Sequence, residues 1–118
     1  MAVQSLLAIE KERTPYVVEL KREVLRKTIE VCKVLLKSAR SRTFSIKLKT
    51  LIRYGYISYV RNTTDINILK GLMSRLYPPR EIVNQHFYRE LEKALRENFN
   101  VKIRRRGSHR YAVFMKPF

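Results

Sequence analysis

The sequence contains one cysteine, Cys32, three glycines and no tryptophan among its 118 residues. A single thiol excludes an internal disulfide and any metal site that needs several thiolate ligands. Cys32 lies on the apolar side of a helical pattern, so we expect it to be a small buried core residue. No stretch approaches the roughly 20 consecutive apolar residues of a membrane-spanning helix, and we therefore expect no membrane partner.

Acidic residues are also scarce: 10 Asp and Glu face 26 Lys and Arg, which gives a formal net charge of +16. An excess of this size destabilises a compact chain by self-repulsion, so it favours a polyanionic partner, above all nucleic acid. The two histidines are separated in the sequence, and the glutamates suit surface ion pairs on helices. This pattern predicts a protein that is not an enzyme and that has no catalytic residues, metal or cofactor.

Apolar residues make up 45% of the chain, which is enough for a folded domain with a core of its own. The amino terminus lacks the basic lead and the cleavage pattern of a secretory signal. We therefore expect a cytoplasmic or nucleoid-associated protein.

Residues 1–13 show no sustained periodicity and are predicted to form a flexible arm, with a short helical turn as the alternative. Thr14 suits a helix N-cap and Pro15 suits the first helical position. Apolar residues then recur at helical spacing, which predicts one long amphipathic helix over 14–42. This helix either packs along the remaining body or pairs with another copy, and the second arrangement would give a homodimer through residues 15–42.

The segment TFSIKLKTLIRY fits both a strand and a helix, because its apolar residues satisfy either period. We favour a helix over 43–54 that ends at Gly55, a residue that readily takes the left-handed conformation after a helix. A short strand is predicted at 56–60, which is rich in aromatic and β-branched residues.

Two further helices are predicted at 65–77 and 79–98, joined by a very short turn at Pro78-Pro79. In the second of these helices, Val83 and Phe87 begin an apolar side, and polar residues lie opposite. With the hairpin that follows, the predicted fold class is mainly α with a small C-terminal β-hairpin.

The stretch NVKIRRRGSHRYAVF predicts that hairpin. A type II′ turn with Gly107 first would pair Arg106 with His109 and Val101 with Phe114. In that register, one face of the hairpin is apolar and the other is mainly basic.

Positive side chains crowd at the tip of the predicted hairpin, where like charges repel one another. A second basic block without any acid runs from Lys33 to Arg61. We therefore expect the positive residues to gather on a single flank of the molecule, where a phosphate backbone could lie along them.

The predicted order of helix, short strand, helix, tight turn, helix and basic hairpin resembles a winged helix-turn-helix domain over 43–118, preceded by an added long helix. The resemblance implies that the helix at 79–98 enters a major groove. It also implies that the hairpin, as the wing at 101–116, follows the backbone or a minor groove. The candidate nucleic-acid-binding residues are Arg80, Asn84, Gln85, His86 and Arg89 on the recognition helix, Lys102, Arg104, Arg105, Arg106, His109 and Arg110 on the wing, and Lys47, Lys49 and Arg53 in the second basic block.

The leading interpretation is a double-stranded DNA-binding protein, either a transcription regulator or an architectural protein. The alternative is an RNA-binding accessory protein of a ribonucleoprotein such as the ribosome, where recognition uses phosphates and shape. A dimer that prefers a two-fold DNA site would favour the first interpretation. A monomer that saturates on structured RNA would favour the second.

Overall fold

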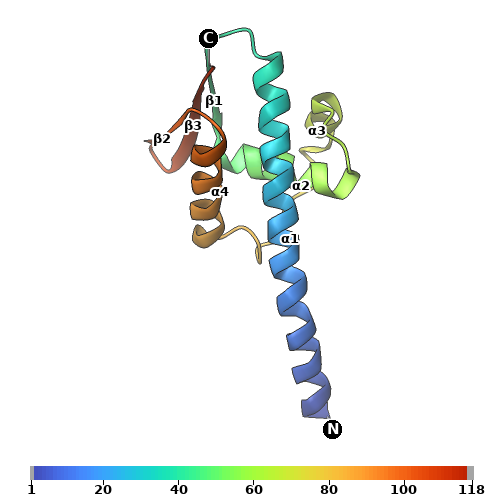
Figure 1. Cartoon of the computed structure of the whole chain (residues 1–118). Helices are drawn as coiled ribbons and strands as arrows, with labels where there is room; N and C mark the ends of the chain where they lie inside the picture. The colour runs from blue at the N-terminus through green and yellow to red at the C-terminus, as the bar shows by residue number, and fades with distance from the viewer. Residues whose placement is uncertain (1, 117–118) are drawn as a thin grey trace.

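The chain has a mixed α/β fold in which a long helix precedes the first strand, further helices follow that strand, and a β-hairpin comes after the last helix (Figure 1). This computed structural model describes the backbone of residues 2–116 and the side chains of residues 16–116. The helices are α1 (Ala2–Ser38), α2 (Leu48–Arg61), α3 (Ile66–Leu72) and α4 (Gln85–Asn98), and the strands are β1 (Thr43–Lys47), β2 (Val101–Arg106) and β3 (His109–Met115).

The strands form a three-stranded sheet in which β3 is central, with β1 and β2 paired antiparallel on either side of it. The β2–β3 hairpin has the predicted register, with Arg106 opposite His109 and Val101 opposite Phe114. Gly107 has a φ of 62°, and no positive φ occurs at the residue after it, which fits a type II′ turn. The hairpin prediction is therefore confirmed.

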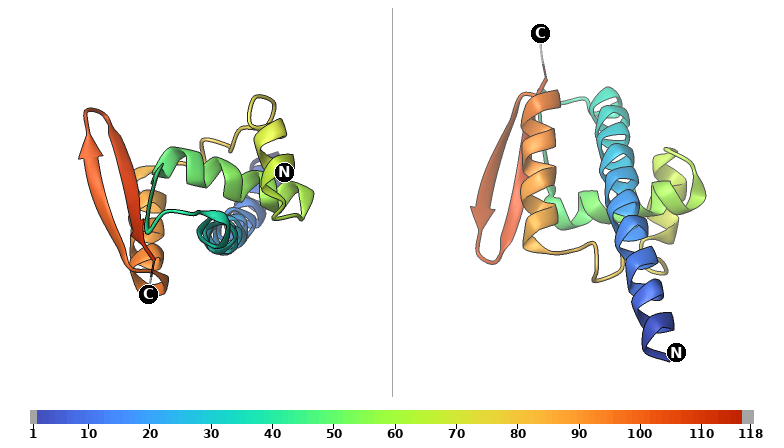
Figure 2. Two further views of the ribbon diagram at one scale, coloured as in Figure 1. Left: turned by 90° about the horizontal axis from the view of Figure 1, so that it is seen from above. Right: turned by 60° about the horizontal axis from the view of Figure 1, so that its bottom comes forward.

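One face of this sheet forms a wall of the hydrophobic core. Ala112 and Phe114 of β3 are buried on it, and the ring of Phe99 meets the Phe114 ring edge-on with 5.5 Å between centroids. Helix α4 packs nearby and buries Phe87 and Leu91. Figure 2 shows α4 beside the sheet and α3 on the opposite side of the molecule, with α1 and α2 between them.

Helix α1 contributes to this same core. Its residues Val24, Val31 and Cys32 are buried together with those of α2, α4 and β3. The predicted burial of Cys32 is thus confirmed, and burial raises the pKa of its thiol to about 12. The long helix was expected either to pack along the body or to pair with another copy. Residues 16–38 pack along the body.

The bounds of α1 differ from the prediction at both ends. The helix begins at Ala2, so the flexible arm predicted at 1–13 is wrong for residues 2–13, and residue 1 lies outside the described residues. The helix continues through Thr14 and Pro15 and ends at Ser38, before the predicted end at 42. Proline is unfavourable in a helix interior, because its missing N–H removes one backbone hydrogen bond and its ring crowds the carbonyl four residues earlier. The first turns extend away from the other elements (Figure 1).

Helices α1 and α2 approach closely at Gly55 of α2. A Cβ atom built on Gly55 would overlap Thr28 Oγ1 of α1 and would lie 2.9 Å from Thr28 Cβ. The Thr28 hydroxyl itself donates to the Val24 carbonyl at 2.7 Å, so it is satisfied within α1. The helix end predicted at Gly55 is therefore wrong, because this glycine permits a close helix crossing in the middle of α2.

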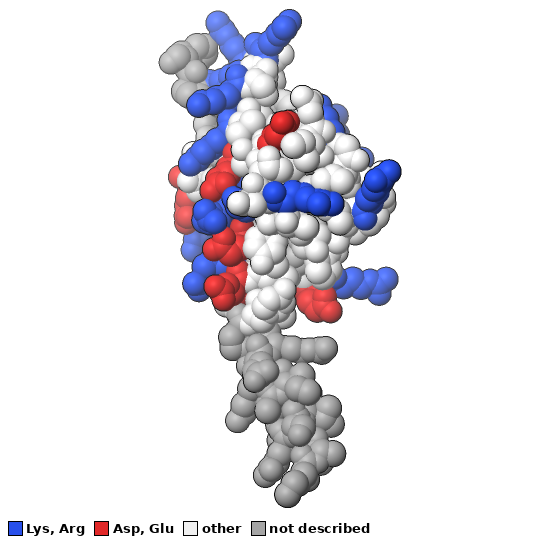
Figure 3. All heavy atoms as spheres, turned by 90° about the vertical axis from the view of Figure 1, so that its right-hand side faces the viewer, with Lys and Arg blue, Asp and Glu red and all other residues white. Residues whose placement is uncertain are grey.

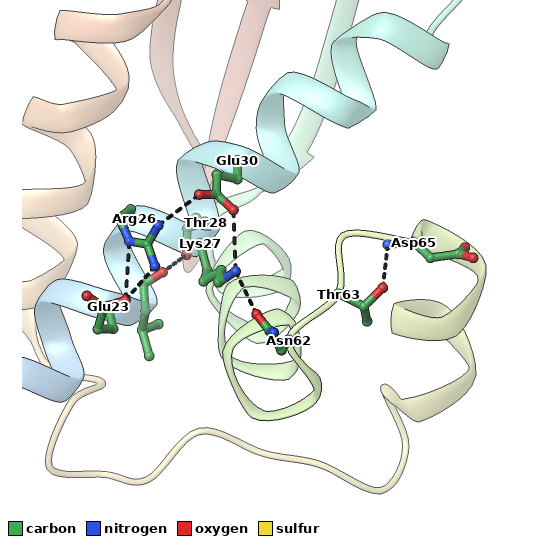
Figure 4. A network of polar contacts seen from close by, with 9 residues as sticks. Glu23, Arg26, Lys27, Thr28, Glu30, Asn62, Thr63 and Asp65 are labelled. Atoms are coloured by element: carbon green, nitrogen blue, oxygen red, sulfur yellow. Dashed lines mark hydrogen bonds and ion pairs between the residues drawn. The ribbon is translucent and has the colours of Figure 1, made fainter.

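Polar side chains join α1 to the end of α2 (Figure 4). Lys27 Nζ donates to Asn62 Oδ1 at 3.2 Å and lies 3.5 Å from Glu30 Oε2. Asn62 has a left-handed backbone with a φ of 51°, which ends α2. Arg26 pairs with both Glu23 and Glu30 on the exposed side of α1. Charges of opposite sign therefore balance each other at this junction.

The predictions made from sequence periodicity are least accurate in the segment after residue 42. Strand β1 covers the start of the helix predicted at 43–54, and α2 includes the strand predicted at 56–60. β1 forms because Ile46 pairs with Ala112 on β3, a contact between residues far apart in the sequence. The residues at 56–60 stay helical because Ile57 is fully buried in the core that α2 shares with α1.

The connection between α3 and α4 is also longer than predicted. Helix α3 ends at Leu72, before the predicted end at 77, and α4 begins at Gln85 instead of 79. The irregular segment 73–84 joins them in place of a very short turn. Ile82 in this segment is fully buried, and its N–H donates to the Pro79 carbonyl at 3.2 Å, so the segment is anchored to the core.

Replacing Gly55 with Ala should lower the free energy of unfolding by about 1–3 kcal/mol, because the added methyl group collides with Thr28. The matched control is Gly71→Ala in α3, where an added Cβ meets nothing within 4 Å. That change should stabilise the protein by about 0.5–1 kcal/mol through helix propensity. Urea unfolding of both variants measures the difference, and equal effects would contradict the close crossing.

Candidate nucleic-acid interface

A groove lies where the tip of the β2–β3 hairpin meets the first turns of α2 and α4. We call it the tip groove, and its volume is about 380 Å³. Its walls combine cationic, hydroxyl, amide and aromatic groups, and no carboxylate lines it among the described residues. The lining residues are Lys47, Leu48, Lys49, Gln85, Tyr88, Arg105, Ser108, His109 and Arg110.

Two strand pairings bring these cations together. Lys47 is the last residue of β1 and lies opposite Tyr111 on β3, next in sequence to Arg110. Helix α2 starts at the following residue without a loop, so Lys49 in its first turn remains close. On the other side of β3, Arg105 lies opposite Arg110. Cations from distant parts of the sequence therefore surround one hollow.

The cations of the hairpin divide between the two faces of the sheet, because successive residues of a strand alternate in direction. Arg105 and Arg110 are partners on the same face as Ile103 and Ala112, which is the face toward the core. The remaining candidates lie on the outer face, where Arg106 Cζ is 5.9 Å from the centre of the Tyr111 ring. These outer residues are Lys102, Arg104, Arg106 and His109.

Arg110 is tied to α4 by an ion pair. Its Nη1 donates to Glu92 Oε1 at 3.1 Å, and the pair is partly buried. Burial raises the pKa of the neighbouring Tyr88 hydroxyl, an effect that the positive charge of Arg110 partly offsets. Among residues 16–116, no carboxylate pairs with Lys47, Lys49 or Arg105. Their positive charge therefore remains uncompensated within the groove.

The amino-terminal ends of α2 and α4 differ in how their free N–H groups are satisfied. Lys47 precedes α2 and makes no side-chain capping bond, so the positive end of this helix adds to the cations of the groove. Asn84 caps α4, since its Oδ1 accepts from the Phe87 N–H at 2.9 Å. Asn84, which we expected to contact nucleic acid, therefore uses its side-chain oxygen to cap α4.

Two of the candidate residues lie away from the tip groove. His86 faces α1: its Nε2 is 2.9 Å from Glu90 Oε1, and it lines a separate hollow with Lys21 and Arg22. Arg53 stacks on Tyr77 from the segment after α3, with Cζ 4.5 Å from the ring centre. The structure thus groups neither residue with the hairpin tip.

Three further candidates, Arg80, Arg89 and Lys102, are exposed and do not line the groove. Arg89 is exposed on α4 and follows Gln85 by four residues, so both lie on the same side of the helix. Arg80 is exposed in the segment before α4, and Lys102 lies on β2 away from the tip. The sequence analysis did not identify Tyr88 as a site residue. Its spacing of three residues from Gln85 could have indicated that both lie on the same side of the helix.

The positive residues do not gather on a single flank. Figure 3 shows the face that carries α3, where Lys and Arg side chains occur at several separate places and most of the acidic side chains follow one edge. The block from Lys33 to Arg61 is also divided, because Lys33 and Lys37 line a second groove that contains none of the tip-groove residues. The expectation of one continuous basic flank is therefore wrong, and the tip groove is a local concentration of charge.

The residues described here contain no group of three His, Cys, Asp or Glu side chains arranged to hold a metal ion. None of the helices in the described part of the chain is long and apolar enough to cross a membrane. Comparisons of the chain with protein-family models, with curated proteins and with solved structures gave no match.

Replacing Asn84 with Ala should lower the free energy of unfolding by about 1 kcal/mol, because it removes the cap of α4. Asn84→Asp should retain most of the stability, since a carboxylate accepts the same hydrogen bond. Asn67→Ala, at an exposed position of α3, is the matched control and should have little effect. Thermal unfolding of the three variants provides the comparison, and an equal loss in Asn84→Asp and Asn84→Ala would contradict the capping role.

Proposed function

We propose that the protein binds nucleic acid, with double-stranded DNA as the favoured partner, and that the tip groove is the centre of its binding surface. One observation carries this proposal: Lys47, Lys49, Arg105 and Arg110 meet around the uncapped start of α2 in a groove that no carboxylate lines among the described residues. Arg110 is paired with Glu92, but repulsion among the other three cations opposes folding. A phosphate placed among all four would be stabilised by them.

The order of the elements supports a winged helix-turn-helix arrangement with different residues from those first assigned. In this arrangement α1 is the first helix, β1 the small strand, α2 the second helix, α4 the recognition helix and β2–β3 the wing. Helix α3 and segment 73–84 are then an insertion between α2 and α4. The long first helix is part of the domain in this proposal, because its side chains share the core.

In this proposal, the first turns of α4 recognise the bases. Gln85 lines the tip groove, and Arg89 lies one turn further along the same side. An amide can pair with the edge of adenine, and a guanidinium with the edge of guanine. On the outer face of the wing, Arg104 and Arg106 would contact phosphates, which position the protein without reading the sequence.

Replacing Arg104, Arg105 and Arg106 together with Ala should weaken binding to all duplex sequences. The slope of log affinity against log salt should become shallower by about three units, since each arginine neutralises one phosphate. Fluorescence anisotropy with a labelled short duplex, measured over a range of salt concentrations, gives this slope. An unchanged slope would remove the hairpin from the binding surface.

The control removes equal charge elsewhere. Lys21 and Arg22 on α1 and Lys70 on α3 lie outside the tip groove, and their joint replacement with Ala should change the slope much less. A folded RNA of similar length serves as competitor in the same titrations. Tighter binding of this RNA at every salt concentration would overturn the preference for DNA and favour a ribonucleoprotein role.

A further inference from the structure

A second groove lies at the other end of the sheet, between the last turns of α1, the end of α4 and the end of β3. We call it the base groove, and its volume is about 820 Å³, within the range of small-molecule sites. Its position at the base of the hairpin separates it from the tip groove by the length of β3, about 20 Å. The two grooves share no lining residue.

The base groove has a mostly apolar surface, although Asn98 and Asn100 also line it. Val34 and Leu36 of α1, Phe99 after α4 and Met115 of β3 line it, and each of them is only half-buried. A hydrocarbon chain lying on these side chains would remove apolar surface from water, at about 25 cal/mol per Å².

Positive charge surrounds this apolar surface. Lys33 and Lys37 line the groove one helical turn apart on α1, and Lys116 lines it from the end of β3, where its Nζ donates to the Ala39 carbonyl. Glu97 is the one acidic residue among the described residues that line the groove. Lys37 in the last turn complements the negative end of α1, but Lys33 lies a turn earlier, and like charges at this spacing repel.

We propose that the base groove binds an amphipathic carboxylate, namely a medium-chain alkyl acid. The alkyl chain lies on Val34, Leu36, Phe99 and Met115, and the carboxylate lies at the rim between Lys33 and Lys37. Charge complementarity selects the anion, since an apolar surface alone would accept a neutral alcohol of equal length. This binding is independent of the tip groove and of any interaction with nucleic acid.

The test is a titration of the whole chain with decanoate and, in parallel, with decan-1-ol, followed by ¹H–¹⁵N NMR. Decanoate should shift the backbone amides of residues 33–37, 97–100 and 115–116, and it should bind about tenfold or more tightly than the alcohol, a difference of about 1.4 kcal/mol. The paired replacement Lys33→Gln and Lys37→Gln should weaken decanoate binding by a similar factor and leave the alcohol unaffected.

The matched control is Lys21→Gln with Lys70→Gln, which removes the same charge outside the base groove and should leave decanoate affinity unchanged. Three results would overturn the proposal: equal affinity for acid and alcohol, amide shifts centred on the tip groove or spread over the surface, or an equal loss of affinity in the control. Retained decanoate binding without any nucleic-acid binding would support this proposal while contradicting the proposed function.

Discussion

The central position of β3 in the sheet is the constraint on which both the core and the tip groove depend. On one side, β3 pairs with β2 and places Arg105 opposite Arg110. On the other side, it pairs with β1, which ends at Lys47 and continues directly into α2. Its inner face gives Ala112 and Phe114 to the core. Without the β1–β3 pairing the hairpin would still be basic, but the start of α2 would not lie beside its tip.

Part of the excess of positive charge lies on two surfaces with different chemistry. The tip groove is polar, cationic and open to the start of a helix, a combination that favours phosphate. The base groove has an apolar surface with lysines at its rim, which favours an anion that carries a hydrocarbon part. At the junction of α1 and α2, by contrast, Arg26 and Lys27 are matched by Glu23 and Glu30 (Figure 4). The tip groove is thus a local concentration of positive charge, and the strand pairing positions its cations.

Local patterns in the sequence predicted the parts of the fold that depend on neighbouring residues. The hairpin register followed from the turn at Gly107 and from alternation on both sides, and the burial of Cys32 followed from helical spacing. Strand β1 could not be found in this way, because its five residues also fit a helix and its partner β3 lies far along the chain. Gly55 was wrongly predicted to end a helix, because its role depends on its contact with Thr28 of another helix. The tip groove was predicted in part. The hairpin cations were identified, whereas Arg53 and His86 were assigned to the binding surface but lie away from the tip groove.

The central claim is that the hairpin tip and the first turns of α2 and α4 form one binding surface for a phosphate backbone. The most direct measurement is the footprint of a short DNA duplex on the ¹H–¹⁵N NMR spectrum of the protein. The account predicts that the amides of residues 47–49, 85–89 and 104–110 change together at one affinity, while those of 66–72 in α3 remain unchanged. Changes centred on α3 or on the exposed side of α1, with the hairpin tip unaffected, would contradict it.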